Sequence, residues 1–372
     1  MTARPSPGRD PLLTVVVPVY GVEPFLRACL DSVLSDGGAD LEVVAVDDAS
    51  PDGCPGLLDG YARSDPRMTV LHLESNVGLG RARNAGLARA GGEYVWFVDS
   101  DDVLPPGSVD AVLSALRAHR PDVLLVDHLR VYDPDGRTET DPSSRVLRDA
   151  GAVGPLSAHP HLVEFQHAAW NKVVRRGHLR DRDLRFYPGW YEDCAFSHPL
   201  LLGAGTIAVL DRVCYHYRQR VTGGITRTVS ERHFDVFDQY ERVFGELDRI
   251  GSAAEPFRAR VFRLMVDHYL VIAGNDQRLP ERLRAEFFHR AARHFRRYRP
   301  ADGYPAPGGV TGLKHRFLAA DAYRAYAALR RAYRLAGATG GAAAAGRPAV
   351  AAGSGPQVAP AESATASRAF SG

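Results

Sequence analysis

The residues best suited to chemistry are three carboxylates that directly follow an apolar run. Residues 94–98 (Y-V-W-F-V) lead straight into Asp99, Asp101 and Asp102. Such a run predicts a strand buried on both faces, as in a parallel sheet. Alternate residues of an extended chain point the same way, so Asp99 and Asp101 can face one point. Oxygen ligands of this kind suit Mg²⁺ or Mn²⁺, which also bind substrate phosphates. A surface turn with a helix cap is the alternative interpretation of this segment.

The composition is that of an ordinary globular protein. The chain has 372 residues, of which 45% are hydrophobic and 24% charged, which is enough for one large domain and a smaller unit. The net charge of +2 does not indicate a nucleic-acid partner. The four cysteines are scattered without a C-x-x-C pair, so neither a zinc site nor a disulfide framework is expected. No apolar signal segment or membrane-spanning run is evident, so we expect a cytoplasmic protein.

The elements around the acidic turn alternate between strands and helices. Strands are expected at 12–20, 41–46, 68–73 and 94–98, with helices from Pro24, near 57–64 and after the glycine-rich turn at 76–80. This order predicts a parallel, doubly wound sheet. Ligands bind at the carboxyl ends of such strands, where Tyr20, Asp47 and Asp48 would then lie beside Asp99 and Asp101. A helix at 108–119 and strands at 122–126, 206–210 and 213–217 should follow.

Changes in composition and in the spacing of apolar residues divide the chain into four parts. We expect a disordered N-terminus at 1–11, an α/β domain at 12–228, a helical region at 229–335 and a disordered tail at 336–372. Apolar residues at helical spacing mark the third part. Arginines gather between Arg282 and Arg299. A solvated helix face is the default interpretation of this cluster, and contact with anionic lipid is the alternative.

Four segments, taken in order, resemble glycosyltransferase family 2, the inverting enzymes of the GT-A fold. They are V-V-V-P-V-Y (15–20), V-D-D-A-S (46–50), N-V-G-L-G-R-A-R-N-A-G (76–86) and F-V-D-S-D-D (97–102). The similarity covers roughly residues 12–220. It implies an α/β GT-A fold, with a mostly parallel sheet sandwiched by helices and a helical C-terminal appendix. It also implies a nucleotide-diphospho-sugar donor, with a UDP-sugar favoured, and Mg²⁺ or Mn²⁺ as cofactor.

The resemblance also assigns roles to individual residues. Tyr20 and Asp48, with Asp47 beside it, would hold the nucleobase end. Asp99 would contact the ribose or the metal, and Asp101 would ligate the metal. In W-Y-E-D (190–193), Asp193 resembles the catalytic base, and Y-H-Y-R (215–218) resembles the segment that closes over the diphosphate. Many relatives have Ser where this chain has Gly224, and Thr222 or Thr226 could replace its phosphate contact.

Inverting sugar transfer has two chemical requirements. A base must take the proton of the acceptor hydroxyl, and the leaving diphosphate must be neutralised. We expect Asp193 to be that base and Glu192 to orient a partner or bind acceptor. Two carboxylates that face a helix dipole are the alternative interpretation.

Other side chains have a binding role beside a structural alternative. One of Arg81 and Arg83 should face the nucleotide, with a surface ion pair as the alternative, because arginines in a first helical turn oppose the dipole. His216 is either a third metal ligand or a structural histidine. Trp170 and Lys172 would line the acceptor side, although Trp170 could be plain core. The complete expected substrate-binding set is Pro18, Tyr20, Glu23, Asp47, Asp48, Asn76, Arg81, Arg83, Asp99, Ser100, Trp170, Lys172, Glu192 and Arg218.

The expected function is therefore metal-dependent, inverting sugar transfer to a hydroxyl acceptor in cell-surface polysaccharide or wall-polymer synthesis. The acceptor would be a glycan, a polyol-phosphate or a lipid-linked sugar, met in the cytoplasm or at the inner face of the membrane through the basic helical region. A homo-oligomer is left open. The alternative is a non-catalytic nucleotide-sugar-binding or scaffold protein with a decayed site. An NAD site is rejected because Arg83 stands in the third slot of the glycine pattern.

Overall fold

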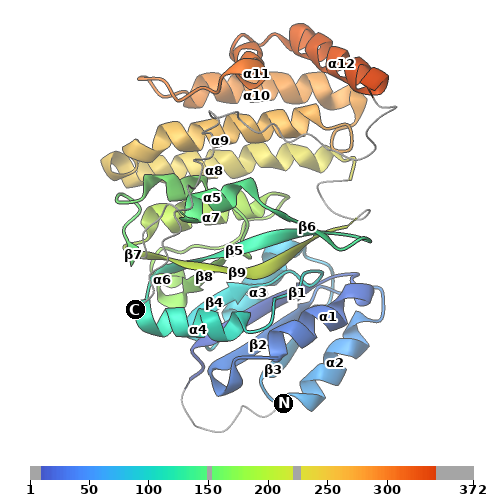
Figure 1. Ribbon diagram of the computed structural model, residues 1–372, viewed down its shortest axis with the longest axis vertical. Helices are drawn as coiled ribbons and strands as arrows, with labels where there is room; N and C mark the ends of the chain where they lie inside the picture. The colour runs from blue at the N-terminus through green and yellow to red at the C-terminus, as the bar shows by residue number, and fades with distance from the viewer. Residues whose placement is uncertain (1–9, 149–152, 221–227, 341–372) are drawn as a thin grey trace, which may run out of the picture.

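A computed structural model describes residues 10–148, 153–220 and 228–340. Its centre is a mixed sheet with strand order β3-β2-β1-β4-β8-β5-β9-β7, in which β6 pairs with β5 (Figure 1). The strands are β1 (Leu13–Val19), β2 (Leu41–Asp47), β3 (Met68–His72), β4 (Tyr94–Phe97), β5 (Val123–Tyr132), β6 (Arg137–Thr140), β7 (Val153–Gly154), β8 (Lys172–Arg175) and β9 (Ile207–Gln219).

Helices cover both faces of the sheet and continue into a helical stack (Figure 1). Those of the sheet domain are α1 (Glu23–Leu34), α2 (Cys54–Ser64), α3 (Leu79–Arg89), α4 (Ser108–His119), α5 (Arg145–Arg148), α6 (Arg176–Asp181) and α7 (Glu192–Gly203). The stack consists of α8 (Asp235–Ile250), α9 (Glu255–Gly274), α10 (Arg284–Tyr298), α11 (Gly309–Ala319) and α12 (Tyr323–Gly340).

The apolar run of β4 is buried on both faces, as predicted. Tyr94 and Trp96 belong to the core under α1, α2 and α4, whereas Val95 and Phe97 belong to the core under α3 and α7. Successive side chains of a strand point to opposite faces, so one strand supplies both cores. This is why the segment carries no polar residue before Asp99.

The helical stack shares a core with the sheet. A single buried cluster contains Phe97 of β4, Phe196 of α7, Phe237 of α8, Phe262 of α9 and Phe288 of α10. The change of texture near residue 229 therefore marks a change of secondary structure, while the packing continues across it. The proposed boundary between residues 228 and 229 stays a prediction.

The parallel part of the sheet was predicted closely. Strands β1 to β4 pair in parallel with one another, and α4 has the expected bounds. The sheet as a whole is mixed, because β8 lies antiparallel to both β4 and β5.

The second half of the sheet differs more from the prediction. The strands expected at 206–210 and 213–217 form one long strand, β9, whose pairing with β5 shifts register between Leu210 and Val213. That irregularity places the exposed Asp211 and Arg212, which resemble a break in the sequence, inside a continuous strand. Helix α12 reaches Gly340, so the expected start of the tail at residue 336 falls within this helix. Residues 1–9, 221–227 and 341–372, which include Thr222, Gly224 and Thr226, lie outside the described residues.

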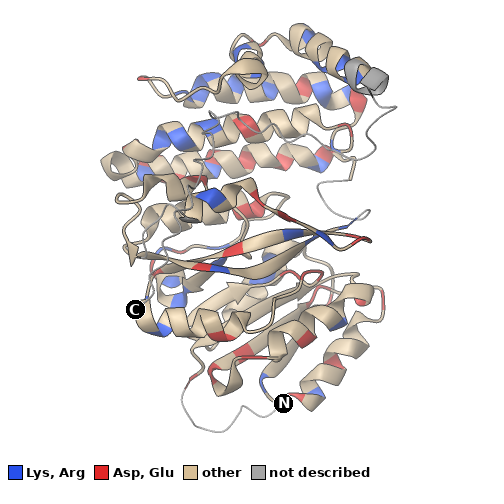
Figure 2. Ribbon diagram, in the orientation of Figure 1, with Lys and Arg blue, Asp and Glu red and all other residues tan. Residues whose placement is uncertain are grey.

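The arginine cluster of the helical region is laced with ion pairs. Arg282 pairs with Glu231, Arg290 with Asp238 and Arg297 with Glu241. Figure 2 shows acidic residues among the basic ones along these helices. This pattern favours the solvated helix face over the lipid-binding alternative. Within the described ranges, every helix is too short or too polar to span a bilayer.

Candidate active site

A cavity of about 790 Å³ lies at the carboxyl edge of the parallel strands, between the start of α3, the start of α7 and helix α9. Its volume falls in the range that holds small-molecule ligands. The predicted residues that line it are Pro18, Tyr20, Asp48, Asn76, Arg81, Arg83, Asp99, Ser100, Asp101, Trp170, Glu192, Asp193 and Arg218. Segments that are far apart in the sequence thus meet in one place.

Asp48 holds the glycine-rich turn in position. Its carboxylate oxygens accept hydrogen bonds from the backbone N–H groups of Val77 at 2.7 Å and Gly78 at 2.9 Å. Gly78 has φ of +88°, a conformation that residues with a Cβ rarely adopt. The turn brings the N-terminus of α3 to the cavity beside Tyr20, whose ring is 51% exposed.

Arg83 links two carboxylates at the cavity wall. Its guanidinium is buried and lies 2.6 Å from an oxygen of Asp99 and 2.7 Å from an oxygen of Glu192. It also lies over the ring of Phe186. The dipole penalty expected for a cation in this first helical turn is thus offset by two acids. Arg81, by contrast, is exposed at the rim.

The carboxylates of the acidic turn have two different environments: Asp102 is buried and supports the turn, whereas Asp101 faces the cavity. Asp102 is buried and accepts hydrogen bonds from the Tyr215 hydroxyl and the Arg218 backbone N–H, both at 2.7 Å. Asp101 faces the cavity and pairs with Arg220 at 2.9 Å. Burial raises the pKa of Asp101 and outweighs the opposing charge of Arg220. Asp102 therefore shapes the turn that presents Asp101.

Glu192 and Asp193 open helix α7 and both line the cavity. Tyr191 precedes them in a left-handed conformation, with φ of +64°. Burial raises the pKa of both carboxyls, although Arg83 acts in the other direction. Glu192 is held by Arg83, whereas Asp193 makes no ion pair with any residue that the structure describes. Of the two, Asp193 is therefore better placed to accept a proton.

Trp170 serves both of the roles considered for it. It is almost fully buried and stacks on Tyr215, with ring centroids 4.5 Å apart. It also lines the cavity.

Two residues expected at the nucleotide support a neighbouring turn and do not line the cavity. Asp47 accepts a hydrogen bond from the Ser50 N–H at 3.0 Å and pairs with His72 at 2.9 Å. Glu23 accepts from the Gly53 N–H at 2.8 Å. Each carboxylate accepts a hydrogen bond from a local backbone donor, so the structure does not support substrate contact by either, and the expected contact stays a prediction.

Lys172 and His216 also lie outside the cavity lining. Lys172 is fully buried, and its ammonium donates to the carbonyl oxygens of Gln166 and Ala168 and to Asn171 Oδ1, at 2.6–2.9 Å. His216 lies between Tyr215 and Tyr217, which turn toward Trp170. Alternation along β9 therefore directs the His216 ring to the face opposite the two tyrosines. The structure does not support the binding roles expected for Lys172 and His216, which stay predictions.

Sequence reasoning also missed part of the cavity wall. Helix α9 and its flanks contribute Leu264, Asp267, His268, Val271 and Arg278, and the loop before β8 contributes His167. The residues of α9 sit in an amphipathic helix whose sequence pattern indicates only packing. Their place at the cavity depends on how the helical stack docks onto α7.

A mixed sheet sandwiched by helices, with a carboxylate-lined cavity at the carboxyl edge of its parallel strands, is typical of the GT-A class of glycosyltransferase folds. The model described as glycosyl transferase family 2 matches residues 14–175. Residues 14–175 are thus similar to glycosyl transferase family 2, and the relatives described next carry glycosyltransferase names.

Similar proteins come from several bacteria. EpsJ of Bacillus subtilis, described as an uncharacterized glycosyltransferase, is 32% identical over 56% of this chain and 61% of its own length. The alignment thus spans less than two thirds of EpsJ. The glycosyltransferase GlyG of Streptococcus pneumoniae is 25% identical over 69% of this chain and 87% of its own. The succinoglycan biosynthesis protein ExoO of Rhizobium meliloti is 29% identical over 70% of this chain and 76% of its own.

A solved structure has the same fold. The crystal structure of Staphylococcus aureus TarS 1–349 in complex with UDP-GlcNAc superposes with a TM-score of 0.69 and 22% identity. The match covers 87% of this chain and 92% of that one. It therefore includes the helical region as well as the sheet.

Proposed function

We propose that this protein transfers a sugar, with inversion, from a UDP-sugar to a hydroxyl acceptor during the synthesis of a cell-surface polysaccharide or wall polymer. The observation that carries the proposal is that Asp48, Asp99, Asp101 and Asp193, from separate segments, line one cavity of about 790 Å³. The UDP-GlcNAc complex of TarS supports the donor class, and the name of ExoO supports the polymer.

The donor would lie along the carboxyl edge of the strands. The exposed ring of Tyr20 offers a face on which a base can stack. The backbone around Asn76 and Gly78 lines the same part of the cavity. Arg218 and Arg220 at the end of β9 supply positive charge for the diphosphate. In this arrangement the base of the donor would lie at Tyr20 and the diphosphate near Asp101, with the ribose between them.

The residues present fit a divalent cation. Asp101 and Asp99 are oxygen donors two positions apart at a strand end, and burial raises the pKa of Asp101, which a nearby cation would oppose. Mg²⁺ is commonly held by one or two carboxylates together with substrate phosphates. When bound there, the ion would neutralise charge on the leaving diphosphate. His216 is not part of this proposed set, because it lies outside the cavity lining.

Asp193 would act as the base. In the single displacement, the acceptor oxygen forms a bond to the anomeric carbon as the bond to the diphosphate oxygen breaks. The acceptor proton passes to Asp193, which works by being held within hydrogen-bond reach of that oxygen. Arg83 positions the neighbouring Glu192 and Asp99 around this point.

The test is Asp193→Asn, with Asp211→Asn on the exposed part of β9 as the matched control. We expect Asp193→Asn to lower transfer by about 10²-fold or more, while UDP affinity by calorimetry stays close to that of the parent. The substrates for this assay would be identified first, by screening a panel of nucleotide-sugars and a panel of acceptors for transfer in the presence of Mn²⁺. Full turnover by Asp193→Asn would refute the base assignment. Absence of binding and hydrolysis for every nucleotide-sugar would refute the function.

A further inference from the structure

A cluster of soft metal ligands lies beside the proposed base. His167 precedes β8, Cys194 lies in the first turn of α7, and His268 lies on α9. Their potential ligand atoms all lie within 4.8 Å of one another, and both histidines line the cavity. No sequence pattern predicts this group, because its members are far apart and the cysteines form no C-x-x-C pair.

We propose that His167, Cys194 and His268 bind a transition-metal ion of the Zn²⁺ type, which ties helix α9 to α7 at the wall of the cavity. This site is separate from the carboxylates of the acidic turn, and it does not depend on the transfer reaction proposed above.

The geometry is close to that of a bound site. Bond lengths near 2.3 Å to sulfur and 2.0–2.1 Å to nitrogen give edges of about 3.3–3.6 Å for a tetrahedron of these ligands. Cys194 Sγ and His268 Nδ1 are 3.9 Å apart. Contraction of the cluster by about 1 Å, within reach of side-chain rotation, would bring all of its ligand atoms to a metal.

The hydrogen bonding of the histidines leaves ligand positions open. The ring of His198, next to the cluster, donates to the Cys194 carbonyl at 3.0 Å and is satisfied by protein. The ring of His167 makes no hydrogen bond with any described residue, although it stacks on His198 and on His268. His167 is half-buried and lines the cavity, so its ring is accessible to an incoming ion. A neutral imidazole ring is the form of histidine that ligates metals.

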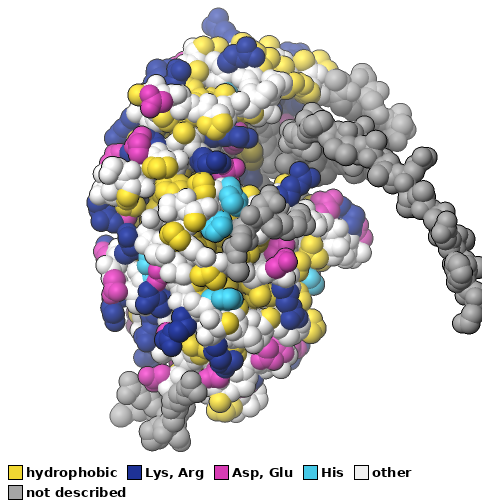
Figure 3. Space-filling view, turned by 60° about the vertical axis from the view of Figure 1, so that its left-hand side comes forward, with side chains coloured by type: hydrophobic (Ala, Val, Ile, Leu, Met, Phe, Trp, Pro, Cys, Tyr) yellow, Lys and Arg dark blue, Asp and Glu magenta, His cyan; other side chains and the backbone are white. Residues whose placement is uncertain are grey.

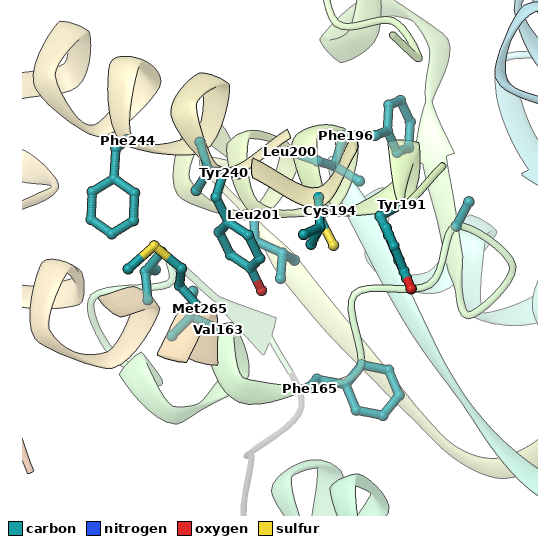
Figure 4. Packing of buried hydrophobic residues seen from close by; sticks show 14 of the residues in the cluster. Val163, Phe165, Tyr191, Cys194, Phe196, Leu200, Leu201, Tyr240, Phe244 and Met265 are labelled. Atoms are coloured by element: carbon teal, nitrogen blue, oxygen red, sulfur yellow. The ribbon is translucent and has the colours of Figure 1, made fainter. Parts of the chain in front are cut away.

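The chemistry of the donors selects the ion. One thiolate with two imidazoles suits Zn²⁺, and three protein ligands leave a fourth position for water or an acceptor oxygen. Figure 4 shows Cys194 between Tyr240 and Tyr191, so the thiol is enclosed by aromatic side chains. Histidine side chains also reach the molecular surface beside apolar ones in Figure 3. On metal binding the Cys194 thiol would release its proton to solvent, as coordinated thiols do.

The alternative is a metal-free contact in which the Cys194 thiol donates weakly to His268, with the Tyr240 hydroxyl 3.3 Å from the same nitrogen. That arrangement satisfies His268 but leaves the His167 ring without a hydrogen bond to any residue that the structure describes. The two interpretations differ in one measurable respect, since only the first binds an ion through sulfur.

The test is a Co²⁺ titration of the untagged full-length protein after removal of metals with a chelator. We expect one Co²⁺ per chain with intense tetrahedral absorption and a thiolate-to-cobalt charge-transfer band, and displacement of Co²⁺ by one equivalent of Zn²⁺. Co²⁺ bound at Asp99 and Asp101 would give no thiolate band. Cys194→Ser should abolish this band and weaken binding by more than about 100-fold.

Matched variants separate binding from misfolding. Cys214→Ser replaces another buried free cysteine, on β9, and should keep the band. His167→Gln should weaken binding while leaving the circular dichroism spectrum of the protein unchanged, because this ring has no hydrogen-bond partner to lose. Absence of stoichiometric Co²⁺ binding by the parent, or a band of full intensity in Cys194→Ser, would overturn the proposal.

Discussion

Replacing Arg83 by methionine should destabilise the protein strongly, although only one side chain changes. Arg83 is 2% exposed and is the cation paired with both Asp99 and Glu192. Methionine keeps much of the apolar stem but removes the charge. Two carboxylates at the cavity wall then lose their compensation, which is the costly way to break a buried ion pair.

The size of the effect follows from the geometry. Two charges about 4 Å apart attract by about 4 kcal/mol at an effective dielectric constant of 20. Desolvation of the guanidinium offsets much of the attraction from the two pairs, and loss of one partner of a buried pair typically costs about 3–5 kcal/mol. The side chain of Asp99 is 23% exposed, so water compensates part of its loss. We therefore expect a decrease of about 3 kcal/mol in the free energy of unfolding.

Urea unfolding followed by tryptophan fluorescence and by circular dichroism would measure this decrease. The matched control is Arg81→Met, two residues away on the exposed rim, which should change stability by less than about 0.5 kcal/mol. Adding Glu192→Gln to Arg83→Met should recover part of the loss, because one uncompensated charge disappears. Equal unfolding midpoints for Arg83→Met and Arg81→Met would refute the reasoning.

Three further predictions concern packing, pH and a buried cation. Gly86→Ala would place a Cβ in steric overlap with Val16 Cγ1, so it should lower the free energy of unfolding by about 1–3 kcal/mol. An unchanged urea midpoint would contradict this close packing. The hydrogen bond to Asp47 raises the pKa of His72, so this pair should stabilise the fold below pH 6.5 and lose its effect as pH rises through the raised value. His72→Gln should thus lower the urea midpoint at pH 5.5 but not at pH 8.5, by less than about 1 kcal/mol. Lys172→Met should lower stability through unsatisfied carbonyl groups while leaving the KM for acceptor unchanged, and a raised KM would show a binding role.

The fold and the strand-edge part of the cavity could be predicted from local sequence, because a parallel sheet places the carboxyl ends of its strands at one edge. Apolar runs define β1, β2 and β4, and their carboxyl ends must share one edge. Tyr20, Asp48 and Asp101 therefore meet wherever the sheet forms.

The remaining residues could not be placed from the sequence, for different physical reasons. The orientation of His216 could not be predicted without the register of β9, because a shift of one position along a strand moves a side chain to the opposite face of the sheet. Lys172 needed the carbonyl groups that surround its ammonium, which only the folded loop brings together. His268 needed the docking of α9 onto α7, a contact between residues 74 positions apart. Local sequence patterns give no information about these contacts between distant segments.

The common core of sheet and helices bears on how such enzymes diversify. Phe196 of α7 and Phe237 of α8 belong to one buried cluster, so a chain cut at residue 228 would uncover a broad apolar surface and tend to aggregate. Exchanging the helices between relatives would at the same time exchange His268 and Arg278 at the cavity. Solubility and the composition of the cavity wall are thus inherited together, and chimeras that change one must repair the other.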